Sequence, residues 1–308
     1  AELVMNILIT GGTGLIGSCF IKQFRCHTFT VLTRFPSKAK VQLPESSEFI
    51  SSLDELHNLD NFDAVINLVG EPIIDKRWSA KQKLIITQSR LQITRRLVEL
   101  IAGSKQPPKV FLSGSAIGIY GDRVDEVLTE SSTLHNTDFP SELCIQWEAL
   151  AKQAEPYTRV VRMRTGIVLA SHGGALAKML LPFKCCLGGI IGDGQQYMSW
   201  IHYRDHIHAM DYLLETDSVS GAVNLVAPIP EKNQVFTQAL AKVLGRIAVL
   251  PFPKKILALL LGESSCLLLS SQRIVPQRLL DSGFKFRFPT LNIALQELLE
   301  SSSDTRMK

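Results

Sequence analysis

The amino-acid sequence predicts an α/β fold, a doubly wound parallel sheet with a smaller C-terminal α/β lobe. Short apolar segments alternate with helical patterns along the first half of the chain, as in parallel sheets with helices on both faces. Residues 64–69 read Ala-Val-Ile-Asn-Leu-Val. Such nearly continuous apolar runs are typical of parallel strands that are covered on both sides.

The expected elements follow one another in a regular order. In the first half we expect strands at residues 5–10, 28–33, 48–50, 63–69, 109–113 and 158–164, and helices at 15–25, 80–102 and 141–154. In the glycine-punctuated second half we expect a helix after Tyr203, a strand at 222–226, and helical segments at 234–243, 254–261, 273–281 and 290–300. We expect one domain at residues 1–165 and a second lobe at 166–308, with segments that cross between them.

Composition limits the function classes. A chain of 308 residues that is 45% hydrophobic can bury a sizeable core. A net charge of +4 and 7% aromatic residues do not favour nucleic-acid binding. Six cysteines without a CxxC pair suit a reduced, cytoplasmic setting. No secretory signal or membrane-spanning apolar run is visible, so we expect neither export nor a membrane partner.

A glycine-rich run follows the first expected strand. Gly11 permits a tight turn, Gly14 lets backbone N–H groups approach a pyrophosphate, and Gly17 lets the next helix pack closely on the sheet. The N-terminus of that helix attracts phosphate charge. An ordinary glycine-rich turn is the alternative, but strand, loop and helix are all in place. We therefore predict a Rossmann-type dinucleotide site at Gly11, Thr13, Gly14, Leu15, Ile16 and Gly17.

The end of the second strand indicates which dinucleotide is bound. About 20 residues past the glycines, an Asp or Glu would hold the ribose hydroxyls of NAD. The sequence instead has Thr33 and Arg34 there, with Lys38 nearby. A guanidinium suits a 2′-phosphate, so we expect NADP (NADPH) as the cofactor. A solvated arginine at a strand end is the alternative.

These motifs resemble the extended short-chain dehydrogenase/reductase superfamily, to which the nucleotide-sugar epimerases belong. The resemblance rests on residues 10–17, on 67–70, and on the serine segment from Ser113 through Gly121. An atypical, epimerase-like branch is closer still and covers nearly the whole chain. Its matching pieces are Gly70-Glu71-Pro72, Arg77-Trp78, Ser89-Arg90, Gly188-Gly189, Trp200-Ile201-His202, and the tail from Pro276 through Phe284.

The resemblance implies further cofactor contacts. Leu68, Val69 and Gly70 would flank the cofactor after the fourth strand, and Arg90 would lie near it on the following helix. Val168 would lie near the nicotinamide, or simply pack in the core. Ser113 follows the fifth strand, at the sheet edge where open α/β sheets bind ligands.

The usual acid/base pair of the superfamily is missing. No tyrosine is followed four residues later by lysine, and the helix where the pair belongs reads Leu-Cys-Ile-Gln-Trp-Glu at residues 143–148. Ser115, Tyr120 and Glu148 are the remaining catalytic candidates. Each has a structural alternative: local turn bonding for the serine, core packing for the tyrosine, and a surface pair with Lys152 for the glutamate.

The loop at residues 188–196 resembles the substrate-side segment of the epimerases. Gln195, Trp200 and His202 are the expected substrate residues, although a tight structural loop would explain them equally well. His202 and His206 are four residues apart, but no HExxH context surrounds them, so we expect no metal.

Two functional hypotheses remain from the sequence. The first is an NADP-binding, epimerase-like oxidoreductase with a non-standard acid/base that acts on a small molecule, for example a nucleotide sugar. The second is a non-catalytic NADP-binding protein that senses redox state or docks a partner. The sequence does not predict an oligomeric state.

Overall fold

The computed structural model describes residues 4–304 and contains a seven-stranded sheet in which every neighbouring pair is parallel. Its strands are β1 (Asn6–Thr10), β2 (Thr28–Leu32), β3 (Glu48–Ile50), β4 (Ala64–Asn67), β5 (Val110–Ala116), β7 (Arg159–Thr165) and β11 (Gly221–Leu225). The order is β3-β2-β1-β4-β5-β7-β11, so the order reverses between β1 and β4. Open α/β sheets bind ligands at this reversal, outside the carboxyl ends of the strands.

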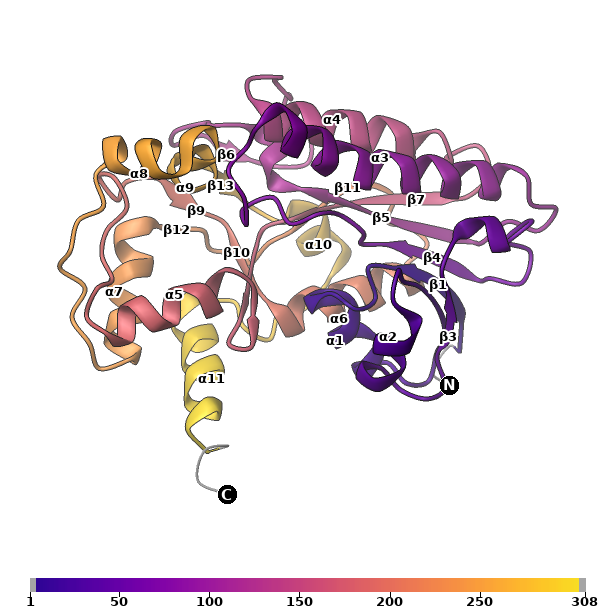
Figure 1. Cartoon of the computed structure of the whole chain (residues 1–308), viewed down its shortest axis with the longest axis horizontal. Helices are drawn as coiled ribbons and strands as arrows, with labels where there is room; N and C mark the ends of the chain where they lie inside the picture. Colours follow the sequence, from indigo (N-terminus) through magenta and orange to yellow (C-terminus); the bar gives the residue numbers. More distant parts are fainter. Residues whose placement is uncertain (1–3, 305–308) are drawn as a thin grey trace.

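Two layers of helices cover the sheet, as Figure 1 shows. On one face, α3 (Ala80–Ala102) and α4 (Phe139–Lys152) bury Leu97, Ile101 and Ala151 against the strands. On the other face, α1 (Leu15–Gln23) and α6 (Tyr203–Glu215) bury Phe20 and Leu213. The predicted Rossmann-type α/β fold is therefore confirmed.

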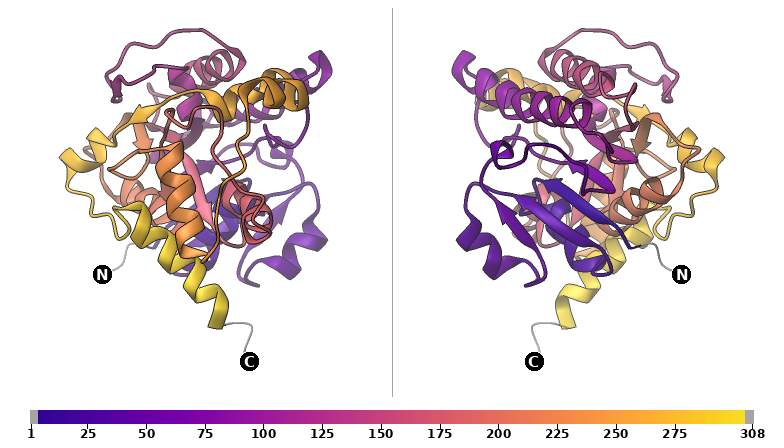
Figure 2. Two further views of the ribbon diagram at one scale, coloured as in Figure 1. Left: turned by 90° about the vertical axis from the view of Figure 1, so that its left-hand side faces the viewer. Right: turned by 90° about the vertical axis from the view of Figure 1, so that its right-hand side faces the viewer.

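The second half of the chain forms a smaller layer beside the carboxyl edge of the sheet (Figures 1 and 2). Its helices α5 (Gly174–Lys184), α7 (Asn233–Val243) and α11 (Leu291–Asp304) surround a buried cluster that includes Trp200, Phe236 and Leu295. Three two-stranded ladders join it: β8 (Ile167–Ala170) with β10 (Trp200–His202), β9 (Tyr197–Met198) with β12 (Glu231–Lys232), and β6 (Val127–Leu128) with β13 (Arg273–Ile274). Because β11 and α6 return to the large sheet, the second half of the chain also helps to build it.

The remaining elements include one correction. The stretch predicted as a helix at 273–281 begins as β13, and α10 (Gln277–Ser282) starts only after Pro276. Pro276 has no N–H, and it disfavours the helical conformation of the residue before it, so the two elements separate there. The other short elements are α2 (Pro36–Gln42), η1 (Leu53–Glu55), η2 (Ile117–Tyr120), α8 (Lys254–Leu261), η3 (Gly262–Ser265) and α9 (Cys266–Leu269).

No helix within residues 4–304 combines the length and the apolar character that crossing a membrane requires.

The turn between β1 and α1 depends on two glycines. Gly11 has φ +70°, and a Cβ there would lie 2.7 Å from the carbonyl carbon of Leu68. A Cβ on Gly17 would lie 2.4 Å from the carbonyl oxygen of Gly11. Neither gap admits a side chain, so the turn, the start of α1 and the segment after β4 are held in close contact.

Replacing Gly17 with alanine should therefore damage the turn. We expect Gly17→Ala to lower the free energy of unfolding by about 1–3 kcal/mol, since the added methyl group meets backbone that cannot rotate away. Urea denaturation followed by circular dichroism measures this. Gly103→Ala is the control, because Gly103 ends α3 at φ −82° and its new Cβ would come no closer than 3.3 Å to another atom. Equal stability of the two variants would contradict the prediction.

Candidate functional site

The N-terminus of α1 faces the crevice at the strand reversal. Gly14 is its N-cap residue and no side chain caps the helix, so its first N–H groups remain available to a ligand. Gln42 holds the turn from outside by donating to the carbonyl oxygen of Thr13 at 3.0 Å. Leu15 packs against the turn at Gly173, where a Cβ would come within 3.0 Å of it. An uncapped helix N-terminus behind a glycine turn fits a pyrophosphate.

The end of β2 carries exposed positive charge. Thr33 is buried and its hydroxyl accepts a hydrogen bond from the backbone N–H of Phe35 at 3.2 Å, which fixes the bend after the strand. Arg34 and Lys38 are exposed, and their charged groups lie 5.9 and 5.2 Å from the centre of the Phe35 ring. Two cations held by one aromatic ring fit a phosphate group on the adenosine side of a dinucleotide.

A chain of buried hydrogen bonds connects the elements at the point where the strand order reverses. Thr10 Oγ1 donates to Asn67 Oδ1 at 2.6 Å and accepts from the backbone N–H of Val69 at 3.3 Å. Thr94 Oγ1 accepts from Asn67 Nδ2 and from Trp147 Nε1, both at 2.9 Å. The chain therefore connects β1, β4, α3 and α4, and it places the segment after β4 directly beside the glycine turn.

Arg90 and Ser113 lie near this chain. The Arg90 guanidinium lies close to Gly70 and to the indole of Trp147, whose ring centre is 5.4 Å from Cζ. Ser113 is fully buried on β5, and its hydroxyl has no hydrogen-bond partner in the described part of the chain. Val168 is half-buried on β8 and packs against the main core. The structure thus places all the predicted cofactor residues at the carboxyl ends of the strands or on elements packed beside them.

The three catalytic candidates meet in one buried cluster around an arginine. Arg164 donates to both carboxylate oxygens of Glu148, at 2.7 and 2.9 Å. Ser115 donates to the same carboxylate at 2.7 Å, and the Arg164 Nη1 group donates to the Tyr120 hydroxyl at 2.9 Å. Glu148 is buried, so the alternative of a surface pair with Lys152 is wrong.

The titration behaviour of this cluster follows from burial. Burial raises the pKa of Tyr120, so its hydroxyl stays protonated and donates to Asn224 Oδ1 at 2.7 Å. Burial alone would lower the pKa of Arg164, but the hydrogen bonds and charge of Glu148 raise it above its usual range. Each candidate acid or base is therefore hydrogen-bonded within the protein. The cluster is built to hold β5, β7 and α4 together.

Arg164 is the residue of this cluster that the sequence analysis did not single out. The signal was present, because β7 carries Arg159, Arg162 and Arg164 within a strand that also has Val160, Val161 and Met163. An arginine inside a buried strand requires a buried partner.

The predicted substrate residues do not lie together on one open surface. Trp200 is fully buried, and its indole N–H donates to the carbonyl oxygen of Ile229 at 3.1 Å. His202 is also fully buried. It caps α6, stacks on Phe288, and bonds Glu297 at 2.8 Å. Neither side chain has a surface that a substrate could touch.

The protonation of His202 agrees with this structural placement. Burial lowers its pKa to about 4, against the raising effect of Glu297. The imidazole is therefore neutral near pH 7.

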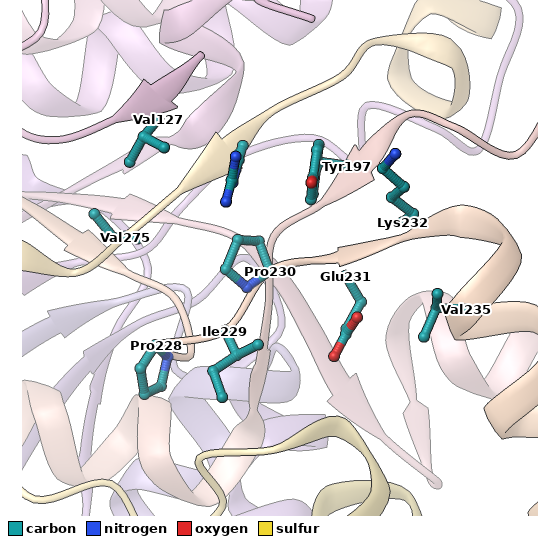
Figure 3. Close-up of a pocket in the computed structure, with 10 residues that line it drawn as sticks. Val127, Tyr197, Pro228, Ile229, Pro230, Glu231, Lys232, Val235 and Val275 are labelled. Carbon is teal, nitrogen blue, oxygen red and sulfur yellow. The ribbon is translucent and has the colours of Figure 1, made fainter. Parts of the chain in front are cut away.

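Gln195 alone of the three predicted substrate residues is exposed. It is not among the residues that line the nearby cavity of about 430 Å³ (Figure 3), but it bonds one of them. Its side chain accepts a hydrogen bond at 3.0 Å from Lys232, which lines the cavity. The charged groups of Lys232 and Arg273 lie 5.5 and 5.0 Å from the ring centre of Tyr197. Val275 and Ile229 contribute apolar wall. Two cations beside an aromatic ring fit an anion that has a planar or apolar part.

Within residues 4–304, no group of three or more His, Cys, Asp or Glu side chains is arranged to hold a metal ion.

The fold and the glycine turn define a dinucleotide-binding α/β protein. The chain belongs to the NAD dependent epimerase/dehydratase family, whose profile matches residues 7–226. Residues 252–298 match a domain of unknown function, DUF1731. This membership confirms the epimerase-like resemblance, and it supports a nicotinamide dinucleotide as the ligand of the glycine turn.

Similar proteins agree with this assignment. An epimerase family protein of Staphylococcus aureus (strain bovine RF122 / ET3-1) is 37% identical, over 95% of this chain and 98% of that protein. The structure of human epimerase family protein SDR39U1 (isoform 2) with NADPH is 35% identical with a TM-score of 0.89, covering 96% of this chain and 99% of that one. The structure of a nucleoside-diphosphate sugar epimerase from Corynebacterium glutamicum is 29% identical with a TM-score of 0.75. The match covers 99% of this chain and 61% of that one.

The ion pair between Glu148 and Arg164 should be critical for stability. We expect Glu148→Gln to lower the free energy of unfolding by about 3–5 kcal/mol, because it leaves a buried guanidinium without its counter-charge. Chemical denaturation measures the loss.

The control is Glu142→Gln, which changes an exposed glutamate of the same helix and should cost less than about 0.5 kcal/mol. Adding Arg164→Met to Glu148→Gln should recover part of the loss, since the uncompensated charge is then gone. A Glu148→Gln protein as stable as the unaltered protein would show that the pair is dispensable.

Proposed function

We propose that the chain is an NADP-dependent, epimerase-like oxidoreductase that acts on a small molecule. The observation that carries the proposal is the pairing of an uncapped glycine turn after β1 with exposed Arg34 at the end of β2. The first suits a pyrophosphate and the second a 2′-phosphate. The NADPH in the structure of the 35% identical human protein supports the same preference.

In this proposal residues 1–165 bind the cofactor, and residues 166–308 supply most of the substrate side. The bound nicotinamide supplies hydride chemistry. The α1 N-terminus would hold the pyrophosphate, and the hydrogen-bond chain from Thr10 to Trp147 would keep the segment at Val69 and Gly70 against the cofactor. Because the Tyr-x-x-x-Lys pair is missing, the proton of the reaction would come from water or from the substrate itself.

A non-catalytic NADP-binding sensor is the second candidate. One observation favours it: Ser115, Tyr120 and Glu148 are all buried and already hydrogen-bonded within the protein. A cofactor site without a free acid or base nearby can report the redox state of the cofactor without turning over a substrate.

On the substrate side, the cavity at Tyr197 suits an anionic molecule. Lys232 and Arg273 supply two positive charges against the one carboxylate of Glu231, while Val127, Val235 and Ile229 supply apolar wall. A diphosphate attached to a planar base, as in a nucleotide sugar, has both the charge and the flat surface that such a wall accepts. Val275 connects the cavity to the buried cluster, since its carbonyl oxygen accepts from Asn224 at 3.1 Å.

The cofactor assignment is tested by titration with NADPH and NADH, followed by nicotinamide fluorescence. We expect NADPH to bind more tightly than NADH. Arg34→Ala should weaken NADPH binding by about tenfold or more and leave NADH unchanged, because only NADPH has the 2′-phosphate. Arg25→Ala, at another exposed arginine of the same half, is the control. If neither nucleotide binds, both the oxidoreductase and the sensor proposals fail.

The substrate side is tested with uridine diphosphate as the probe. We expect calorimetry to detect its binding to the protein saturated with NADPH, and Arg273→Met to weaken it by about tenfold, since one charge-assisted contact is lost. Lys285→Met removes an exposed charge of the same half and should have no effect. Equal affinity in the Arg273→Met protein, or no binding at all, would count against an anionic substrate in this cavity.

A further inference from the structure

Arg90 is a partly buried cation beside the segment that follows β4. Its guanidinium lies close to Gly70, where a Cβ would lie 2.7 Å from Cζ, and 5.4 Å from the ring centre of Trp147. Nη1 donates to the carbonyl oxygens of Glu71 and Ile86, both at 3.1 Å. No hydrogen bond of the described structure engages Nε or Nη2. The group is therefore fixed in position, and part of its donor capacity is unused.

The charge of Arg90 has no direct counter-ion. None of the ion pairs in the described structure includes it. Against the effect of burial, the charge of the Glu71 carboxylate raises the pKa of Arg90, but this carboxylate forms its ion pair with Lys76 at 3.4 Å. Glu148 is occupied by Arg164, and burial raises the pKa of the Cys144 thiol beside Arg90 to about 12, so that thiol is uncharged. Burial lowers the pKa of Arg90, but a guanidinium remains charged at neutral pH.

The sheet order shows which end of the cofactor Arg90 would meet; this step rests on the proposed function. β2, with Arg34 at its end, lies on one side of β1, and β4 and β5 lie on the other. If the 2′-phosphate lies at Arg34 and the pyrophosphate at the turn after β1, the nicotinamide half must extend over β4 and β5. Gly70 follows β4, and a Cβ on Gly114 of β5 would lie 2.9 Å from the Trp147 ring. Arg90 is therefore on the nicotinamide side.

We infer that Arg90 makes the site select the reduced cofactor. The oxidised nicotinamide ring carries a positive charge, whereas the dihydronicotinamide ring of NADPH is neutral. A fixed guanidinium in a crevice of low dielectric repels the first and not the second. At an effective dielectric constant of about 20, repulsion between like charges near one another changes an affinity by on the order of tenfold or more. The protein would hold NADPH and release NADP⁺.

The test measures binding of NADPH, NADP⁺ and 2′,5′-ADP by calorimetry to the unaltered protein and to Arg90→Gln. In the unaltered protein we expect NADPH to bind at least about tenfold more tightly than NADP⁺. In Arg90→Gln the ratio should fall toward one, mainly because NADP⁺ binds more tightly. Arg90→Lys keeps the charge and should keep most of the ratio. Arg95→Gln, at an exposed arginine of the same helix, should leave it unchanged.

The outcomes separate this inference from the proposed function. Equal binding of NADPH and NADP⁺ by the unaltered protein overturns the inference and leaves the cofactor assignment intact. The same conclusion follows if Arg90→Gln keeps the ratio of the NADPH and NADP⁺ affinities, or if it lowers both affinities equally. The unaltered protein alone shows whether NADPH binds more tightly than NADP⁺, so the inference can be contradicted even if a variant misfolds. Failure of all three nucleotides to bind the unaltered protein overturns the proposed function and this inference together.

Discussion

The hydrogen-bond chain from Thr10 through Asn67 and Thr94 to Trp147 is the constraint on which the crevice depends. Its members are buried, so any group left unpaired would cost about 1–3 kcal/mol. The partners of Thr94 determine which groups of the chain donate hydrogen bonds and which accept them. Thr94 gives its own proton to the carbonyl oxygen of Arg90 at 2.8 Å, so it must accept from both Asn67 and Trp147. Two helices and two strands are thereby fixed around the point where the sheet order reverses.

The arginines around this frame differ in what surrounds them. Arg164 is buried against the Glu148 carboxylate and the Tyr120 hydroxyl, so its charge serves to hold elements together. Arg34 is exposed, where a phosphate can replace water at little cost. Arg90 lies between these extremes, enclosed by Gly70 and Trp147 but without a carboxylate partner. In the proposed site, burial and partners thus give the three arginines different roles: Arg164 holds elements together, Arg34 would bind a phosphate, and Arg90 would set the local electrostatic potential.

Local sequence patterns predicted the elements whose signal is long or strongly apolar. The expected bounds of α3 and α8 agree with the structure. Each strand of the main sheet lies within about two residues of its expected place, except that β5 continues to Ala116 instead of ending at residue 113. The two-residue ladders were not predicted, because such short strands have no periodicity. Arg164 bonds Glu148, 16 positions away in the sequence, and Tyr120, 44 positions away. A local pattern does not reveal such contacts. Trp200 and His202 were expected to face substrate, but burial is decided by tertiary packing, which neighbouring residues do not reveal.

The missing Tyr-x-x-x-Lys pair and the charge of the crevice have one structural origin. Where the resemblance places that pair, α4 has Leu143 or Cys144 in place of the tyrosine and Trp147 or Glu148 in place of the lysine, and Gly114 on β5 provides the space that the Trp147 indole occupies. The indole bonds Thr94 on one side and supports the Arg90 guanidinium on the other. A lysine in place of Trp147 would bring a second cation next to Arg90. If Trp147 stands where the lysine would be, the replacement that breaks the pair also supports Arg90, which the proposed placement of the cofactor puts on the nicotinamide side.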